Sequence, residues 1–228
     1  MTIRVTRKKA DAYQHGDLHE ALVQAGLKLL AEGGPAALSL RAAAQLAGVS
    51  HAAPYRHFRD KQALVGAIAE RGFRLLTASM RDEAARHESS AVGTPDARQL
   101  LLALGAGYVR FATRNPSYLQ VMFGGVLGDQ QLSAEQKAAG EEAYLTLRNA
   151  VADGITRGQL KPGDPDQLSL ACWSLVHGLS MLIVNGAFPP PASASAERRM
   201  VTDLVGLLGS GLFTAGGRGA RESRTASG

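Results

Sequence analysis

The stretch that decides the fold is SLRAAAQLAGVSHAAPYRHFRDKQAL, residues 39–64. Its pattern predicts two short helices, 40–47 and 51–57, joined by a tight turn at Gly48-Val49-Ser50. Ser39 precedes the first helix, where its hydroxyl can cap the helix and also meet a phosphate. Gly48 suits a turn that needs a positive φ. Two short helices around a glycine turn are typical of a helix-turn-helix.

The outer face of this segment carries mostly hydrogen-bond donors. Val49 and Phe58 are the residues expected to anchor the segment to its core. The side chains left pointing outward are His51, Ala52, Tyr55, Arg56, His57 and Lys61. Such donors suit a surface that contacts phosphates and bases. An alanine-rich helical hairpin with a solvated charged face has the same spacing, so spacing alone leaves both interpretations open.

Helical periodicity extends through nearly all of the remaining chain, and no segment has the pattern of a strand. The first helix starts near Leu18 and is stopped by Gly33-Gly34-Pro35. Further helices are expected at 60–87, 96–114, 118–123, 133–155, 164–187 and 197–213. Ser133 with Gln136 forms a capping box, and Asp164-Pro165 is another start signal. The fold class is therefore all-α: an N-terminal three-helix helix-turn-helix domain and a larger helical domain.

The predicted organisation has four parts. Residues 1–15 form a flexible basic arm, 16–62 the helix-turn-helix domain, 63–214 the larger domain, and 215–228 a disordered tail rich in Gly, Ser and Arg. Residues 63–88 are expected to form a helix that bridges the two domains. The arm holds Arg4, Arg7, Lys8 and Lys9. Either it contacts the minor groove of a nucleic acid, or it is a solvated tail.

Composition sets broader limits. The net charge of +5 and pI near 9.6 favour a polyanionic partner only weakly, but residues 1–62 hold nine Lys/Arg against five acidic residues. The single cysteine, Cys172, indicates a reducing compartment. The N-terminus lacks the apolar core of a signal peptide, and residues 168–188 look too mixed for a membrane span. We therefore expect a cytoplasmic protein without a membrane partner.

Motifs for catalysis, cofactors and metals are weak. No Walker motif, nucleophile elbow or HExxH motif occurs, and Gly105-Ala106-Gly107 is not a dinucleotide fingerprint. His15 and His19 are spaced for a metal, but no third ligand is near them in sequence. We expect no enzyme activity, no cofactor and no metal.

A family resemblance rests on specific residues. Gly48-Val49-Ser50, then Tyr55-Arg56-His57-Phe58, then Lys61 closely resemble the TetR family of bacterial regulators, over about residues 18–69. The resemblance implies a DNA-binding transcriptional regulator with about nine helices. Trp173, His177 and Gly178 look like a C-terminal domain type named for these three residues (WHG), and the preceding 158–165 segment also fits that type.

The resemblance also assigns roles to individual residues. It implies that four residues face or approach base edges: Arg41, His51, Ala52 and Arg56. Five others would hold phosphates: Ser39, Ser50, Tyr55, His57 and Lys61. Pro54 departs from a regular recognition helix because it lacks an N–H group. Either the helix opens as a looser turn at 51–53, or its axis is tilted.

In the larger domain the resemblance implies a homodimer formed by helices 164–187 and 197–213, and hence a palindromic operator. It also implies a mainly apolar effector pocket within a cluster of aromatic, Met and His residues: Tyr108, Phe111, Tyr118, Met122, Phe123, Tyr144, Trp173 and His177. Any one of them could instead be plain core. The expected function is a repressor released by a small, largely apolar ligand. The alternative is an all-helical ligand-binding protein or enzyme with a structural N-terminal hairpin.

Overall fold

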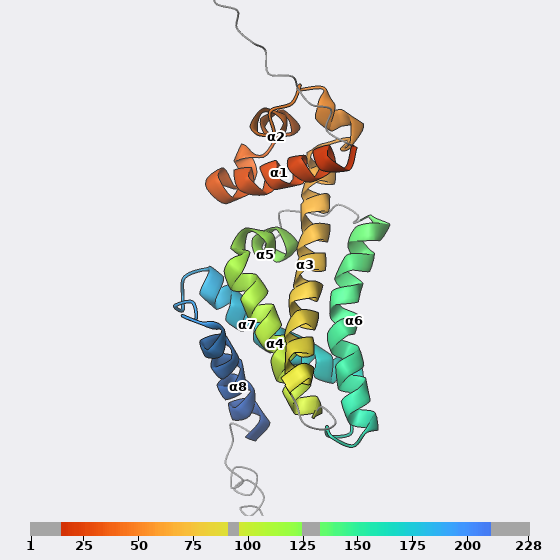
Figure 1. Cartoon of the computed structure of the whole chain (residues 1–228), viewed down its shortest axis with the longest axis vertical. Helices are drawn as coiled ribbons and strands as arrows, with labels where there is room; N and C mark the ends of the chain where they lie inside the picture. The colour runs from red at the N-terminus through yellow and green to blue at the C-terminus, as the bar shows by residue number, and fades with distance from the viewer. Residues whose placement is uncertain (1–14, 91–95, 125–132, 211–228) are drawn as a thin grey trace, which may run out of the picture. The chain divides into compact units, whose positions relative to one another are not determined.

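The computed structural model describes residues 15–90, 96–124 and 133–210, and these residues are helical with short connections (Figure 1). The α-helices are α1 (His15–Ala37), α2 (Leu40–Leu46), α3 (Lys61–Ser90), α4 (Ala97–Arg114), α5 (Pro116–Phe123), α6 (Ala134–Thr156), α7 (Pro165–Val184) and α8 (Ala194–Ser210), with a 3₁₀ turn, η1 (Ala53–Arg56). The predicted all-α class is confirmed. The predicted basic arm and C-terminal tail lie outside the described residues.

The chain divides into two compact units. The first comprises Met1–Thr77 and Arg114–Leu145, and the second comprises Ala78–Thr113 and Thr146–Gly228. The helices α3, α4 and α6 each contribute to both units. The predicted functional boundary at residues 62 and 63 stays a prediction.

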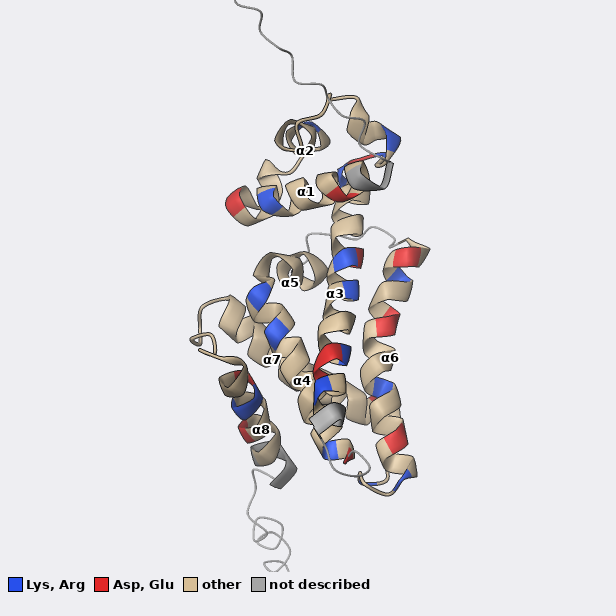
Figure 2. Cartoon of the chain, in the orientation of Figure 1, with Lys and Arg blue, Asp and Glu red and all other residues tan. Residues whose placement is uncertain are grey.

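The first unit packs α1, α2 and η1 around the start of α3, with α5 against α1. Its core includes Leu22, Leu40, Phe58 and Leu64, all of them buried. Figure 2 shows α5 without a single charged residue, in agreement with its sequence PSYLQVMF. The expectation of a short buried helix at 118–123 is confirmed, with the helix beginning two residues earlier at Pro116.

Local signals placed most helix starts correctly. The Ser39 hydroxyl oxygen accepts a hydrogen bond from the Ala42 N–H at 3.0 Å. The capping box is present, because the Ser133 N–H donates to Gln136 Oε1 at 2.8 Å and the Gln136 N–H donates to Ser133 Oγ at 3.2 Å. The Asp164 side chain accepts from the Asp166 N–H. These capping bonds satisfy N–H groups that have no partner within the helix.

Several helix boundaries differ from expectation by a few residues: α7 ends at Val184 and not at the predicted residue 187, and α3 ends at Ser90 and not at the predicted residue 87. Gly34 (φ 65°, ψ −166°) interrupts α1, but a further helical turn follows it to Ala37. The glycine therefore kinks the helix where the sequence predicted its end. The last helix begins at Ala194, three residues before the predicted Glu197, because Ser193 Oγ accepts from the Ala196 N–H at 3.2 Å and caps it. The predicted end of that helix at Phe213 lies outside the described residues.

The second unit buries Tyr108, Val109 and Phe111 of α4 against neighbouring helices that include α8 through Val201. Of the helices described, α7 is long and apolar enough by length and composition to cross a membrane. The sequence interpretation of residues 168–188 as too mixed did not anticipate this. Core helices of water-soluble proteins pass the same test, yet only 17% of this stretch is buried. Most of the apolar surface of α7 is therefore left uncovered in the single chain.

Candidate nucleic-acid interface and effector pocket

The second short helix of the helix-turn-helix is not an α-helix, and this corrects the sequence prediction for 51–57. Residues 51 and 52 form a turn, and Ala53–Arg56 is a single 3₁₀ turn with Pro54 in its first positions. Pro54 cannot donate a backbone hydrogen bond, so it suits a helix start, where N–H groups have no helical partner. The structure realises the looser-turn alternative.

Pro54 is also a buried anchor of this turn, which sequence reasoning missed. Its carbonyl oxygen accepts hydrogen bonds from the N–H groups of His57 and Phe58, both at 2.9 Å. Gly48 precedes the turn with φ 71°, as predicted. The turn is therefore fixed by one glycine on its entry side and by buried Pro54 and Phe58 beneath it.

The outer surface of the turn presents most of the predicted DNA-contacting side chains. Exposed are Arg41, Ser39, Ser50, His51, Ala52, Tyr55 and Arg56. Tyr55 is 57% exposed, a high value for an aromatic side chain. Arg59, which the prediction left out, is also exposed and pairs with Asp60 at 3.1 Å. The sequence signal that could have identified Arg59 is its position directly after Phe58, the residue expected to anchor the segment.

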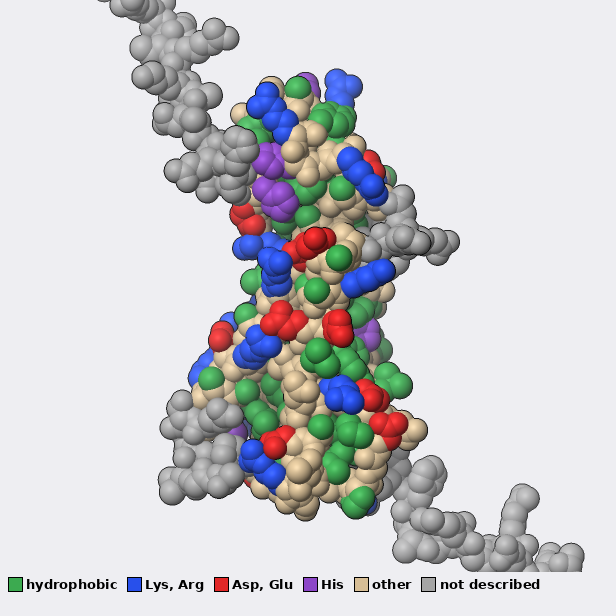
Figure 3. Space-filling model, turned by 90° about the vertical axis from the view of Figure 1, so that its right-hand side faces the viewer, with side chains coloured by type: hydrophobic (Ala, Val, Ile, Leu, Met, Phe, Trp, Pro, Cys, Tyr) green, Lys and Arg blue, Asp and Glu red, His purple; other side chains and the backbone are tan. Residues whose placement is uncertain are grey.

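Two predicted phosphate-binding residues are less accessible. Lys61 is partly buried, and its Nζ donates to the Pro35 carbonyl oxygen at 2.6 Å. The His57 ring lies 6.1 Å from the His19 ring, centroid to centroid, in an edge-on arrangement. Figure 3 shows histidine side chains gathered on one face of the first unit, next to Lys and Arg side chains. A phosphate role for either residue stays a prediction.

An apolar cavity of about 340 Å³ lies in the second unit. Its lining comes from α3, α4, α6, α7 and α8 and includes Met80, Leu104, Tyr108, Cys172, Trp173 and Val201. Sequence reasoning had selected only Tyr108 and Trp173 of this lining. For the other lining residues, the one indication in the sequence is that α7 is apolar on more than one face.

The predicted pocket residues fall into two separate groups. Tyr108, Phe111, Trp173 and His177 belong to the second unit, and Tyr118, Met122, Phe123 and Tyr144 to the first. The Phe123 ring stacks edge-on with Phe73 at 5.5 Å. Tyr118 accepts a hydrogen bond from Gln24 at 3.2 Å. In the first unit, this packing fits the alternative that these residues are plain core and do not line a pocket.

Tyr108 and His177 form the polar pair next to the cavity. The Tyr108 Oη and His177 Nδ1 atoms lie 2.8 Å apart, and the Trp173 ring meets the Tyr108 ring edge-on at 5.4 Å. Burial raises the pKa of Tyr108 above its ordinary range and lowers the pKa of His177. Both side chains are therefore neutral, and Tyr108, the member of the pair that lines the cavity, can offer a ligand a hydrogen bond without charge.

The chain is thus an all-helical protein of the helix-turn-helix class. Its outer turn is exposed, and it has a separate apolar cavity. Comparison with known proteins is consistent with this class. Residues 22–68 match the model of the bacterial regulatory proteins of the tetR family, and residues 101–204 match that of a tetracyclin repressor-like C-terminal domain. The chain therefore belongs to the tetR family, a family of transcriptional regulators and not of enzymes.

Individual relatives agree. An HTH-type transcriptional repressor of Mycobacterium tuberculosis is 42% identical over 64 residues, which are 28% of this chain and 34% of the repressor. This chain thus spans about a third of the length of the curated relatives it matches. A protein of unknown function from Rhodococcus sp. RHA1 is 30% identical with a TM-score of 0.70, covering 85% of this chain and 96% of that one.

A further solved structure shows the fold alone. AibR, in complex with isovaleryl coenzyme A and operator DNA, is 17% identical with a TM-score of 0.61, covering 82% of this chain and 97% of that one. The match of residues 101–204 is to the tetracyclin repressor-like domain, so the narrower Trp-His-Gly type stays a prediction.

Proposed function

We propose that this protein is a repressor that binds a palindromic operator as a homodimer and is released by a small, largely apolar ligand. The observation that carries the proposal is the turn at 51–56, whose Pro54 is buried while Tyr55 and Arg56 are exposed. This arrangement projects a donor and a cation outward from a fixed backbone, as contacts to a duplex require.

The proposed contacts are those that the family resemblance implies, and most of the side chains are exposed. Arg41, His51, Ala52 and Arg56 would face base edges, and Arg can pair with guanine through two hydrogen bonds. Ser39, Ser50, Tyr55, His57 and Lys61 would hold phosphates. The Ser39 Oγ accepts the capping hydrogen bond, so its hydroxyl proton is left to donate to a phosphate oxygen.

The homodimer would pair α7 and α8 with the same helices of a second copy. Two exposed leucines of α7 support this pairing: Leu170 is 61% exposed and Leu182 is 47% exposed. A Cβ atom added at Gly178 would meet no atom within 4 Å in the single chain. A helix with exposed leucines and a small residue between them suits close approach of a symmetric partner.

The proposed effector site is the apolar cavity of the second unit. Its volume of about 340 Å³ falls within the usual range for small-molecule pockets. The Tyr108–His177 pair would supply the polar contact. AibR, which has the same fold, has been solved with an acyl coenzyme A and operator DNA together, and this supports the combination of the two sites in one chain. A DNA partner in a bacterial cell implies a cytoplasmic protein.

A mobility shift with the DNA upstream of the gene tests the proposal. The wild type should bind this DNA with an affinity that falls steeply as salt rises. Arg56→Ala should weaken binding strongly, whereas Arg157→Ala, which removes the same charge from the exposed turn after α6, should leave it unchanged. Equal affinity for all three proteins would count against the helix-turn-helix as the DNA-binding site.

A further inference from the structure

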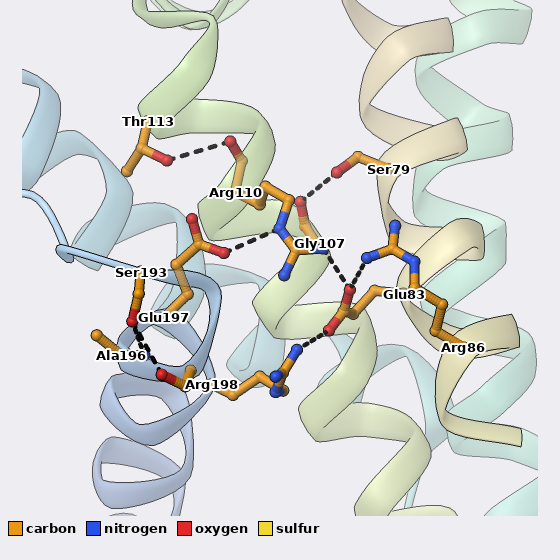
Figure 4. Close-up of polar contacts among 11 residues, drawn as sticks. Ser79, Glu83, Arg86, Gly107, Arg110, Thr113, Ser193, Ala196, Glu197 and Arg198 are labelled. Atoms are coloured by element: carbon orange, nitrogen blue, oxygen red, sulfur yellow. Dashed lines mark hydrogen bonds and ion pairs between the residues drawn. The ribbon is translucent and has the colours of Figure 1, made fainter. Parts of the chain in front are cut away.

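Three arginines in the second unit converge on one buried carboxylate (Figure 4). Glu83 of α3 is 3% exposed. Its Oε1 accepts a hydrogen bond from Arg198 of α8 at 2.8 Å, and its Oε2 accepts from Arg86 at 2.6 Å and from Arg110 of α4. Burial raises the pKa of Glu83, but the hydrogen bonds from Arg110 and Arg198 outweigh burial and hold it below its ordinary value. The carboxylate is therefore ionised and saturated with donors.

The cluster has more cationic donors than acceptors. Arg110 is 5% exposed and uses Nε on Glu197 Oε2 at 2.9 Å and Nη1 on Glu83. Its Nη2 is buried and has no hydrogen-bond partner among the described residues. Three guanidinium groups thus share two carboxylates. A buried charged N–H group without an acceptor is costly. Arg110 does not line the pocket beside the cluster, whose arginines are Arg86 and Arg198.

A polar pocket of about 330 Å³ opens beside the cluster. Its lining includes the polar residues Glu83, Arg86, His87, Gln99, Arg198 and Thr202 and the apolar residues Leu102 and Ala103. Arg86 and Arg198 are half-exposed, at 58% and 53%, and each gives Glu83 only one of its five N–H donors. The remaining donors are available to an acceptor in the pocket.

We propose that this pocket, between α3, α4 and α8, binds the oxyanion group of a small solute between Arg86 and Arg198. Guanidinium groups match carboxylate and phosphate oxygens with paired, charge-assisted hydrogen bonds. Both anions share this chemistry, and the Gln99 amide adds a neutral donor. The site is distinct from the apolar cavity, since no residue lines both. It does not depend on DNA binding.

The test is calorimetric titration of the full chain with inorganic phosphate and, separately, with acetate, at constant ionic strength set by chloride. The wild type should bind at least one of the two anions. The anion that binds more tightly identifies whether the oxyanion group of the solute is a phosphate or a carboxylate. Arg86→Gln should weaken binding about tenfold, because one charge-assisted contact is lost. Glu83 keeps Arg110 and Arg198 in this variant, so the fold is retained.

Two further variants separate this pocket from other basic surfaces. Arg81→Gln removes the same charge from the same helix outside the pocket, and should bind as the wild type does. Gln99→Glu places a competing carboxylate in the pocket that Arg86 and Arg198 line, leaves Glu83 itself unchanged, and should also weaken binding. The proposal is overturned if neither anion binds more than chloride does, or if Arg86→Gln and Gln99→Glu lose no more affinity than Arg81→Gln.

Discussion

Lys61 Nζ donates a hydrogen bond to the backbone carbonyl oxygen of Pro35 at 2.6 Å, and so joins the first turn of α3 to the end of α1. The family resemblance assigns Lys61 to a phosphate, whereas this contact is structural. The two roles are compatible because an ammonium group has three donors.

Lys61→Met separates these roles. Loss of the hydrogen bond should lower the free energy of unfolding by about 0.5–1.5 kcal/mol, measured by urea denaturation. Loss of a phosphate contact should lower the slope of log affinity against log salt by about one. A variant with reduced stability and an unchanged slope would leave Lys61 a structural residue only.

Gly48 gives a prediction about the turn. At φ 71° a side chain is strained, and no atom lies within 4 Å of a Cβ built there, so the cost is one of backbone conformation alone. Gly48→Ala should destabilise the protein by about 1–2 kcal/mol, and Gly48→Asn by less, because asparagine tolerates this region better. Urea unfolding of the two variants measures the difference. Equal stability of the wild type and both variants would argue against a rigid turn.

Gly178 tests the proposed homodimer. Since a single chain has open space there, Gly178→Leu should fold, and replacing a helical glycine favours the helix. In a dimer paired through α7 the added side chain would hold the two helices apart. Sedimentation should therefore show a dimer for the wild type, weaker association for Gly178→Leu and a smaller effect for Gly178→Ala. A leucine variant that associates as tightly as the wild type would place the interface elsewhere.

His177 predicts a pH dependence of stability. Burial lowers its pKa in the folded protein below the ordinary value of 6.5, so the unfolded chain binds the proton more tightly. This contribution to stability is complete above pH 6.5 and is lost as pH falls toward the lowered pKa. Between about pH 7.5 and about pH 5.5, His177→Gln should lose less stability than the wild type in urea unfolding. Identical losses would contradict a half-buried neutral histidine.

Local signals in the sequence predicted much of this fold, because they act over a few residues. Ser39, Ser133 and Asp164 cap helices through bonds to N–H groups two or three positions away. The 3₁₀ turn at Pro54 was one departure, since the family pattern favoured a regular helix while the proline favoured a looser start. Its burial depends on tertiary packing, which the local pattern does not report.

The pocket and the charge cluster depend on which helix faces meet. Tyr108 and Tyr118 both lie on apolar helix faces, yet Tyr108 bonds to His177 and Tyr118 to Gln24, 94 residues away. Nothing in the local sequence of Glu83, Arg110 or Glu197 indicates that they converge. Predictions from periodicity therefore identified the buried faces but not their partners.

The most direct test of the central claim is fluorescence anisotropy of the purified protein with an operator selected from random DNA, over a series of salt concentrations. The account predicts binding by a dimer, a steep fall of affinity with salt, and a strong loss for Arg56→Ala but none for Arg157→Ala. A monomer, or a protein that ignores every duplex at low ionic strength, would contradict it.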